Sequence, residues 1–348
     1  MSGPGTMNVC IVGVGARTAL GLTAASSAAA VRAGITRIAE HPYMVDAKGE
    51  PFMVAMDSTL EGATRRDRMV GLALGALDDV LPSIPHARTM PLSIMIGLPE
   101  ASESLSTAEL SRVCQRIGSA LLDRCQPQIT AVAEGQAAVV VALQRAVEAI
   151  TARRLECCIV GGVDSWIDPD LLEGLDARGR SLGNRWGFAP GEGAAMLAVC
   201  SATFARQARL RPLAWIASVV TTHEPNRMHT ETICVGEALG LALREAAGQA
   251  GTRVTKQFCD IDGDRYREHE FSFAILRVPA TAFVDAVDYV APATNWGNTG
   301  AATGGLLTIL PIMHHQRGHS SGAWPMVWCG SENGRRGALV LHLEPTAA

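Results

Sequence analysis

Short apolar and β-branched runs alternate along the chain with longer stretches whose apolar residues recur at helical spacing. The runs typical of buried strands cover residues 9–14, 92–96, 157–160, 194–200, 216–220, 287–290 and 337–343. The stretches typical of helices cover residues 68–80, 135–153 and 236–250. Apolar runs that are bounded by glycine and separated by helices are typical of α/β proteins with buried strands. The pattern therefore predicts an α/β fold.

Two features of this pattern indicate how the elements are layered. The predicted helix 135–153 carries a broad apolar stripe, Val139, Val140, Leu143, Val147 and Ile150, which suits a helix inside a layered fold. Residues 201–213 form the most polar connector in the middle of the chain, and strand and helix patterns then resume in a similar order. We therefore predict two related halves packed on each other, residues 1–205 and residues 206–348.

The composition of the 348 residues excludes several classes of protein. With 48% apolar and 18% charged residues, the chain is globular rather than disordered. A net charge of -4 gives no electrostatic footprint for nucleic acid. We find no apolar window long enough for a membrane span and no signal peptide at the start. Nucleic-acid and membrane partners are therefore not expected.

The nine cysteines are scattered, and none forms a C-x-x-C pair that could hold zinc. Most lie in apolar runs such as Cys157-Cys158, where thiols behave as small apolar side chains. We predict that every cysteine is buried and reduced, which is the state expected in the cytoplasm. The chain contains only two lysines, Lys48 and Lys256.

Four collinear segments carry a family resemblance. They are VCIVGVGARTALG at 9–21, ITAVAEGQAA at 129–138 with CIVGGVD at 158–164, RWGFAPGEGA at 185–194, and ATNWGNTGAATGG at 293–305. In this order and at these distances they resemble a β-ketoacyl synthase of the thiolase superfamily. The resemblance implies a thiolase-like α/β fold, with two similar halves in a five-layer αβαβα arrangement.

The third of these segments is expected to be structural. Its residues Gly187, Gly191 and Gly193 fit a tight turn with close backbone approach, next to Phe188 and before a buried strand. Glu192 is expected to be a buried, hydrogen-bonded carboxylate, because an unpaired charge there would be costly.

The resemblance also shows which catalytic groups are missing. The family's nucleophile motif T-A-C-x-x-G corresponds to Thr130-Ala-Val-Ala-Glu-Gly135, which places Val132 where the reactive cysteine belongs. Valine has no nucleophilic atom. The two histidines that bind the thioester oxygen correspond to Asp262 and Asn298, and the lysine upstream of the second corresponds to Ala293. An ionised aspartate would repel a developing oxyanion, and asparagine cannot transfer a proton at neutral pH.

The family's glycine-rich gating loop is replaced by CGSENGRRG at 329–337. The sequence therefore predicts a catalytically degenerate chain, with Glu134, Asp262, Asn298, Glu332 and Asn333 lining a remodelled pocket. Any remaining enzymatic activity would be acyl transfer or decarboxylation of an acyl thioester, using Asp262, Asn298 and Glu134. Whether such an activity exists stays open, with a non-enzymatic role preferred.

Other candidate sites are less well supported by their spacing. Asp260, Asp262, Asp264 and Glu268 lack the glycine and glutamate positions of a calcium loop. The histidines His314, His315 and His319 suit a helix C-terminus. Arg265, Tyr266, Arg267 and His269 fit a solvated loop better than an anion site. The loop GVGAR at 13–17 lacks the last glycine of a dinucleotide motif. We therefore predict no metal and no cofactor.

We interpret the chain as a non-catalytic thiolase-like protein that acts through protein–protein contacts. The resemblance implies a dimer, homomeric or heteromeric, through the thiolase-type interface. One such role is that of an adaptor or chaperone-type accessory of bacterial type VI secretion effectors, bound to an effector or adaptor protein. The alternatives are a 3-oxoacyl-ACP synthase-type acyltransferase, a chain-length-factor-like subunit of fatty acid or polyketide synthesis, and an acyl-chain binding protein. A chain-length factor usually carries glutamine rather than valine at the nucleophile position, and acyl carrier protein and acyl-CoA are less favoured partners.

Overall fold

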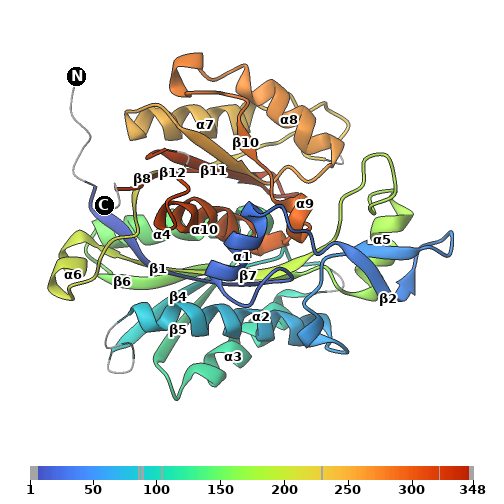
Figure 1. The fold of residues 1–348 in the computed structure, drawn as a ribbon, viewed down its shortest axis with the longest axis horizontal. Coiled ribbons are helices and arrows are strands. Elements are labelled where there is room, and N and C mark those ends of the chain that lie inside the picture. The colour runs from blue at the N-terminus through green and yellow to red at the C-terminus, as the bar shows by residue number, and fades with distance from the viewer. Residues whose placement is uncertain are drawn as a thin grey trace.

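The computed structural model describes residues 7–84, 87, 90–102, 105–228, 230–320 and 322–344. Ten strands of this part of the chain form a mixed sheet in the order β10-β9-β11-β12-β8-β1-β7-β6-β4-β5. The sheet joins at its middle through only two residue pairs, Cys10 with Trp215 and Ile11 with Ala214. On either side of this junction the two halves of the sheet stack with helices between them (Figure 1). The predicted five-layer αβαβα arrangement is confirmed.

The two halves of the sheet repeat one topology. The first contains β1 (Val9–Thr18), β4 (Pro91–Leu98), β5 (Gln126–Ala133), β6 (Cys157–Ser165) and β7 (Glu192–Ser201). The second contains β8 (Ala214–His223), β9 (Lys256–Cys259), β10 (Tyr289–Val290), β11 (Pro325–Gly330) and β12 (Arg335–His342). In both, the strands lie in the chain order third, second, fourth, fifth, first, and the fifth is antiparallel to its neighbours. The division at residue 205 stays a prediction; that residue lies in α6 (Ala202–Gln207), which connects the two halves.

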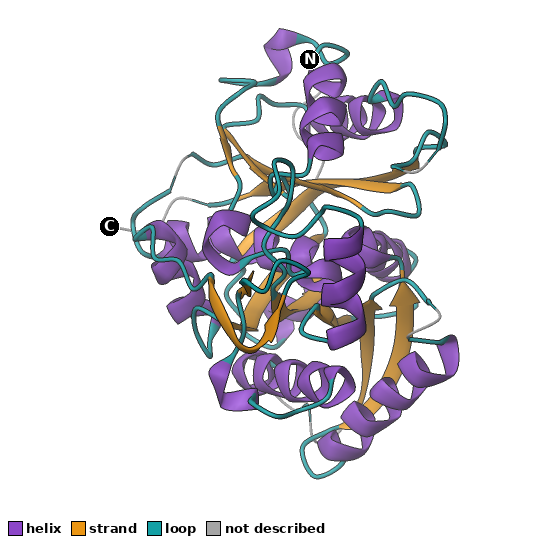
Figure 2. Ribbon diagram, turned by 90° about the vertical axis from the view of Figure 1, so that its right-hand side faces the viewer, coloured by secondary structure: helices purple, strands orange, loops and turns teal. Residues whose placement is uncertain are grey.

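Helices form the three remaining layers. One outer layer contains α2 (Arg65–Val80) and α3 (Thr107–Leu121), and the other contains α7 (Glu237–Ala250) and α8 (Arg265–Ile275). The central layer contains α1 (Ala24–Arg32), α4 (Ala138–Thr151) and α10 (Thr303–Gln316). The hairpin of β2 (Ala39–Val45) and β3 (Pro51–Val54) lies beside α5 (Pro169–Ala177) at one end of the molecule (Figure 1). Loops and short helices, including α9 (Ala293–Trp296), gather near the middle of the face shown in Figure 2.

The apolar stripe of α4 is buried as predicted for an interior helix. Val139, Val140, Leu143 and Ile150 belong to the core between the two halves of the sheet, with Val147 packed against its edge. The α-helix begins three residues later than predicted, because Gly135 has a φ of +59° in the left-handed region and residues 135–137 form a 3-10 turn. This turn positions the start of α4 for the site described below.

Two sequence expectations need correction. The predicted strand 287–290 is reduced to Tyr289–Val290, because Val287 is 68% exposed and Asp288 instead pairs with Lys256. Of the nine cysteines, eight are buried, but Cys114 on α3 is only partly buried. All nine are free thiols in the structure. In the described residues, no helix combines the length and apolarity that crossing a bilayer requires.

Candidate functional site

The turn between β5 and α4 is the place where the sequence predicts a lost nucleophile. Val132 lies one residue before the end of β5, pairs in register with Gly97 of β4 and is 2% exposed. Its side chain packs into the same core as Val139 and Val140, and it lines neither of the cavities described below. The turn itself is made by Glu134 and Gly135, where a Cβ on Gly135 would lie 2.8 Å from Glu100 Oε1. This position therefore presents an apolar side chain to the core.

Asp262 and Asn298, the two positions where the resemblance predicts lost histidines, contact each other. Asn298 donates its side-chain Nδ2 to Asp262 Oδ2 at 2.7 Å, and its Oδ1 accepts from the backbone N–H of Gly300 at 2.9 Å. Burial raises the pKa of Asp262, while the neighbouring Arg267 guanidinium opposes that shift. One of the two amide N–H groups of Asn298 is therefore bound to the Asp262 carboxyl and is not available to an oxyanion.

Little space is left around this pair. The cavity that Asp262 and Asn298 line together with Ala293 has a volume of about 10 Å³. A volume of roughly 10–15 Å³ holds at most one water molecule. A thioester and its acyl chain cannot fit into this cavity.

The turn between β11 and β12, which the sequence predicts in place of a gating loop, contacts the turn before α4 directly. Asn333 donates its Nδ2 to Glu134 Oε2 at 2.9 Å and its backbone N–H to Glu100 Oε1 at 3.0 Å. The Ser331 hydroxyl accepts from the backbone N–H of Ala137 at 2.8 Å and donates to the carbonyl of Glu134. The structure thus brings Glu134 and Asn333 together, on contacts separate from the pair of Asp262 and Asn298.

Ion pairs hold the remaining polar groups of this region in place. Arg267 is 7% exposed and donates to Asp260 Oδ2 and to the carbonyl of Gly330, at 2.5 and 2.7 Å. Arg180 pairs with Asp264 at 3.0 Å and with Glu332 at 2.8 Å. Arg180, from the N-terminal half, therefore binds two carboxylates of the C-terminal half. Because Arg267 is engaged in these ion pairs, it does not supply the free cation that an anion-binding loop at 265–269 would need.

A larger cavity lies on the other side of Gln136. Its volume is about 220 Å³, and Gln136 lines both this cavity and the small one. The lining residues are Arg65, Pro99, Glu100, Ala101, Ser102, Gly135, Gln136, Asp164, Trp166, Leu171, Arg178, Arg180, Gly300 and Glu332. Of the predicted pocket residues only Glu332 faces this cavity. Burial raises the pKa of the Glu100 carboxyl. The hydrogen bond from the backbone N–H of Asn333 partly offsets this rise.

The glycine-rich segment before β7 has the structural role expected from the sequence. A Cβ on Gly187 would lie 1.9 Å from the carbonyl oxygen of Ser181, and one on Gly191 would lie 2.4 Å from that of Trp296. Gly193 is less restricted, because its nearest neighbour would be 3.2 Å away. Phe188 is 1% exposed and packs against Trp166 with ring centroids 5.5 Å apart.

Glu192 begins β7 and is completely buried. Both of its carboxylate oxygens accept from Arg68, at 2.7 and 2.5 Å. It also accepts from the backbone N–H of Asp57 at 2.6 Å and from the Ser165 hydroxyl at 2.7 Å. These four contacts tie β7 to α2 and to the loop after β3, so Glu192 is a satisfied structural carboxylate.

Two thiols lie close to the site, and neither is activated. Cys329 on β11 is completely buried and donates to the carbonyl of Gln136 at 3.3 Å. Cys259 lines the small cavity beside Asp262. Burial raises the pKa of both thiols above the ordinary value, so neither forms the thiolate that nucleophilic attack requires.

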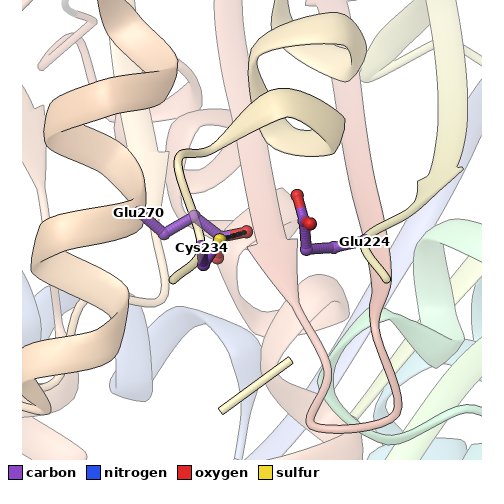
Figure 3. A group of neighbouring side chains, drawn as sticks. All are labelled: Glu224, Cys234 and Glu270. Carbon is purple, nitrogen blue, oxygen red and sulfur yellow. Dashed lines mark hydrogen bonds between the residues drawn. The ribbon is translucent and has the colours of Figure 1, made fainter. Parts of the chain in front are cut away.

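Glu224, Cys234 and Glu270 form the one group in the described residues whose ligand atoms lie close enough to hold a metal ion (Figure 3). Their existing partners explain the cluster without one. Glu270 Oε1 accepts from Arg336 Nε at 2.7 Å, and Glu224 accepts from the backbone N–H groups of Asn226 and Ala238, both at 3.1 Å. Because a guanidinium and the first turn of α7 already offset the two charges, we assign no metal to this cluster.

Sequence reasoning missed the residues that distinguish the larger cavity. Gln136 directly follows the glycine of the predicted nucleophile motif, so its place in the sequence could have identified it as a candidate site residue. Glu100 and Arg178 belong to no motif, and their place in the cavity arises only when the ends of β4 and α5 come together.

Comparison with known proteins identifies the class of fold. No protein-family model matches the chain, and no curated protein sequence matches it significantly. Among solved structures, the type II PKS structure AntDE:AntF, an acyl-carrier protein in complex with its ketosynthase, matches with a TM-score of 0.78 and 14% identity, over 97% of this chain and 100% of that one.

Two further solved structures contain ketosynthases together with chain length factors. The ketosynthase ApeO in complex with its chain length factor ApeC from Xenorhabdus doucetiae matches with a TM-score of 0.75 and 14% identity, over 99% of this chain and 100% of that one. The ishigamide ketosynthase/chain length factor matches with a TM-score of 0.72 and 20% identity, over 97% and 99%. The protein has the thiolase-like fold of ketosynthases and their chain length factors.

Proposed function

We propose that this protein is a non-condensing ketosynthase-fold subunit that acts by pairing with another protein chain. The observation that carries this proposal is the cavity of only about 10 Å³ that the Asp262–Asn298 pair lines, and the valine at 132, where the resemblance predicts the nucleophile, agrees with it. Loss of the nucleophile, of both imidazoles and of the space for a substrate removes each requirement of condensation.

A chain-length-factor-like role agrees with the two neighbours whose names contain a chain length factor. In such a role the fold contributes surface and shape to a partner rather than chemistry. No contact or comparison bears on an association with type VI secretion effectors, so that association stays a prediction from the sequence.

The surface that supports pairing is the edge strand β5. Its one neighbour among the described strands is β4, so its other edge has no partner strand in the part of the chain that the structure describes. Five of its eight residues are exposed: Gln126, Gln128, Thr130, Ala131 and Ala133. An exposed edge with free backbone groups is a template for a strand of a second chain. We propose that this edge forms the dimer interface.

The small cavity at the Asp262–Asn298 pair predicts that the protein does not condense or decarboxylate acyl thioesters. Incubation with malonyl and acyl thioesters is expected to release no CO₂ above the protein-free blank. A Val132→Cys variant is expected to behave in the same way, and its new thiol should resist iodoacetamide while folded, because residue 132 is 2% exposed. Turnover by the unmodified protein that Asp262→Ala abolishes would disprove the proposal.

The edge-strand proposal predicts that the purified protein is a dimer, by itself or with a co-expressed partner. Sedimentation velocity should show conversion to monomer in an Ala131→Arg variant, because a guanidinium on the exposed edge is costly to bury against a second strand. Ala280→Arg is the control, because Ala280 is also exposed but follows α8 in the opposite outer layer. A dimer unaffected by Ala131→Arg would place the interface elsewhere.

A further inference from the structure

The cavity of about 220 Å³ has the location of a ligand site. It lies beyond the carboxyl ends of β4 and β6, where Pro99–Ser102 and Trp166 follow the strands, and beside the start of α4. In open α/β sheets, ligands bind outside the carboxyl ends of the parallel strands. Its volume is below the roughly 300–1,000 Å³ of pockets for drug-sized ligands, so it suits a small molecule.

A buried side chain in this cavity lacks a partner. Gln136 is 4% exposed, and its side-chain amide makes no hydrogen bond with any described residue. The amide therefore has no protein partner, its oxygen and nitrogen both keep some accessible surface, and the residue lines both cavities. An amide side chain offers both a donor and an acceptor, so a polar group of a ligand in the larger cavity can bind to it.

The charges around the cavity select the ligand. Arg65 is paired with Asp164 at 3.1 Å, and Arg180 is paired with Asp264 and Glu332. Among the described residues, Arg178 at the mouth makes no ion pair or side-chain hydrogen bond. One guanidinium thus remains without a counter-charge, and guanidinium groups bind carboxylates through paired hydrogen bonds.

The carboxylates on the wall limit how much negative charge can enter. Glu100, Asp164 and Glu332 all line the cavity, so a dianionic phosphate would be repelled more strongly than a single carboxylate. Pro99, Ala101, Trp166 and Leu171 supply apolar surface beside these charged groups. The cavity therefore combines one free cation, one free amide and an apolar wall.

We propose that this cavity binds a small monocarboxylic acid, with its carboxylate on Arg178, a polar group on the Gln136 amide and its apolar body against Trp166 and Leu171. Each of these residues lines the cavity. The site differs from a tunnel for a long acyl chain in its size and in its charged wall. The inference does not depend on pairing through β5.

The test is a titration of the full-length protein with benzoate and 3-methylbutanoate, followed by ligand-observed NMR. Both acids are expected to bind, and benzamide, which has the shape of benzoate without its charge, is expected to bind at least about tenfold more weakly. Arg178→Gln should weaken binding of the acids by about tenfold or more, as removal of a charge-assisted hydrogen bond does. Gln136→Leu should also weaken it, at an unchanged fold checked by circular dichroism.

Arg185→Gln is the matched control, because Arg185 is also exposed but stacks on Trp186 outside the cavity lining. This variant should bind both acids as the unmodified protein does. Failure of both acids to bind, equal binding by Arg178→Gln, or tighter binding of inorganic phosphate than of the acids would each overturn the proposal.

Discussion

Replacing Arg68 with alanine is expected to lower the free energy of unfolding by about 3–5 kcal/mol, the usual cost of removing one partner of a buried ion pair. Arg68 lies on α2 with a side chain that is 2% exposed, and its guanidinium donates to both oxygens of Glu192 and to the carbonyl of Asp57. Without it, the completely buried carboxyl of Glu192 would lose its charged partner. Total stabilities are roughly 5–15 kcal/mol, so this loss is large.

The measurement is chemical denaturation of the two variants Arg68→Ala and Arg66→Ala. Arg66 lies on the same helix and pairs with Glu109, but its side chain is 47% exposed. Solvent-exposed ion pairs are worth roughly 0–1 kcal/mol, so the control should change the denaturation midpoint little. Equal losses in the two variants would contradict a special role for the buried pair.

The double variant Arg68→Met with Glu192→Leu separates the charge from the hydrogen bonds. Replacing both partners of a buried ion pair by apolar side chains is often neutral. Here we expect only partial recovery, because Glu192 also accepts from the backbone N–H of Asp57 and from the Ser165 hydroxyl. Full recovery would show that these two donors contribute little.

The fold could be predicted from the sequence because its signals are local. The apolar stripe of α4 and the close-packed Gly187 and Gly191 are properties of short segments, and both have the packing expected of them. The substitutions at Val132, Asp262 and Asn298 are equally visible, because they depend only on residue identity at motif positions.

What fills the site could not be predicted in the same way. The hydrogen bond between Asn298 and Asp262 joins residues 36 positions apart, and the one between Asn333 and Glu134 joins residues 199 positions apart. The first contact depends on how the loop after β9 meets the loop after α9, and the second on how the turn between β11 and β12 meets the start of α4. No local pattern encodes either arrangement. For the same reason, the unpartnered amide of Gln136 is visible only after its burial is known.

The segment at Gly191 connects the glycine-rich turn to the loop that carries Asn298, and a Gly191→Ala variant is expected to disturb both. The backbone N–H of Gly191 donates to the carbonyl of Asn298 at 2.9 Å, and the backbone N–H of Asn298 donates to Ala189 at 2.8 Å. An added Cβ would lie 2.4 Å from the carbonyl oxygen of Trp296, which is shorter than any allowed distance between these two atoms. Relief requires the two segments to separate, and overpacking of this kind costs about 1–3 kcal/mol, occasionally more.

Gly248→Ala should have the opposite effect, and this makes the comparison decisive. Gly248 lies within α7, where an added Cβ would meet nothing within 4 Å. Alanine at such a helix position is expected to raise stability by about 0.5–1 kcal/mol, because glycine loses more backbone entropy on folding. The midpoint temperature of thermal unfolding should therefore fall for Gly191→Ala and rise for Gly248→Ala. A Gly191→Ala variant as stable as the unmodified protein would show that the two segments can separate at little cost, and that their close approach does not hold the Asp262–Asn298 pair in place.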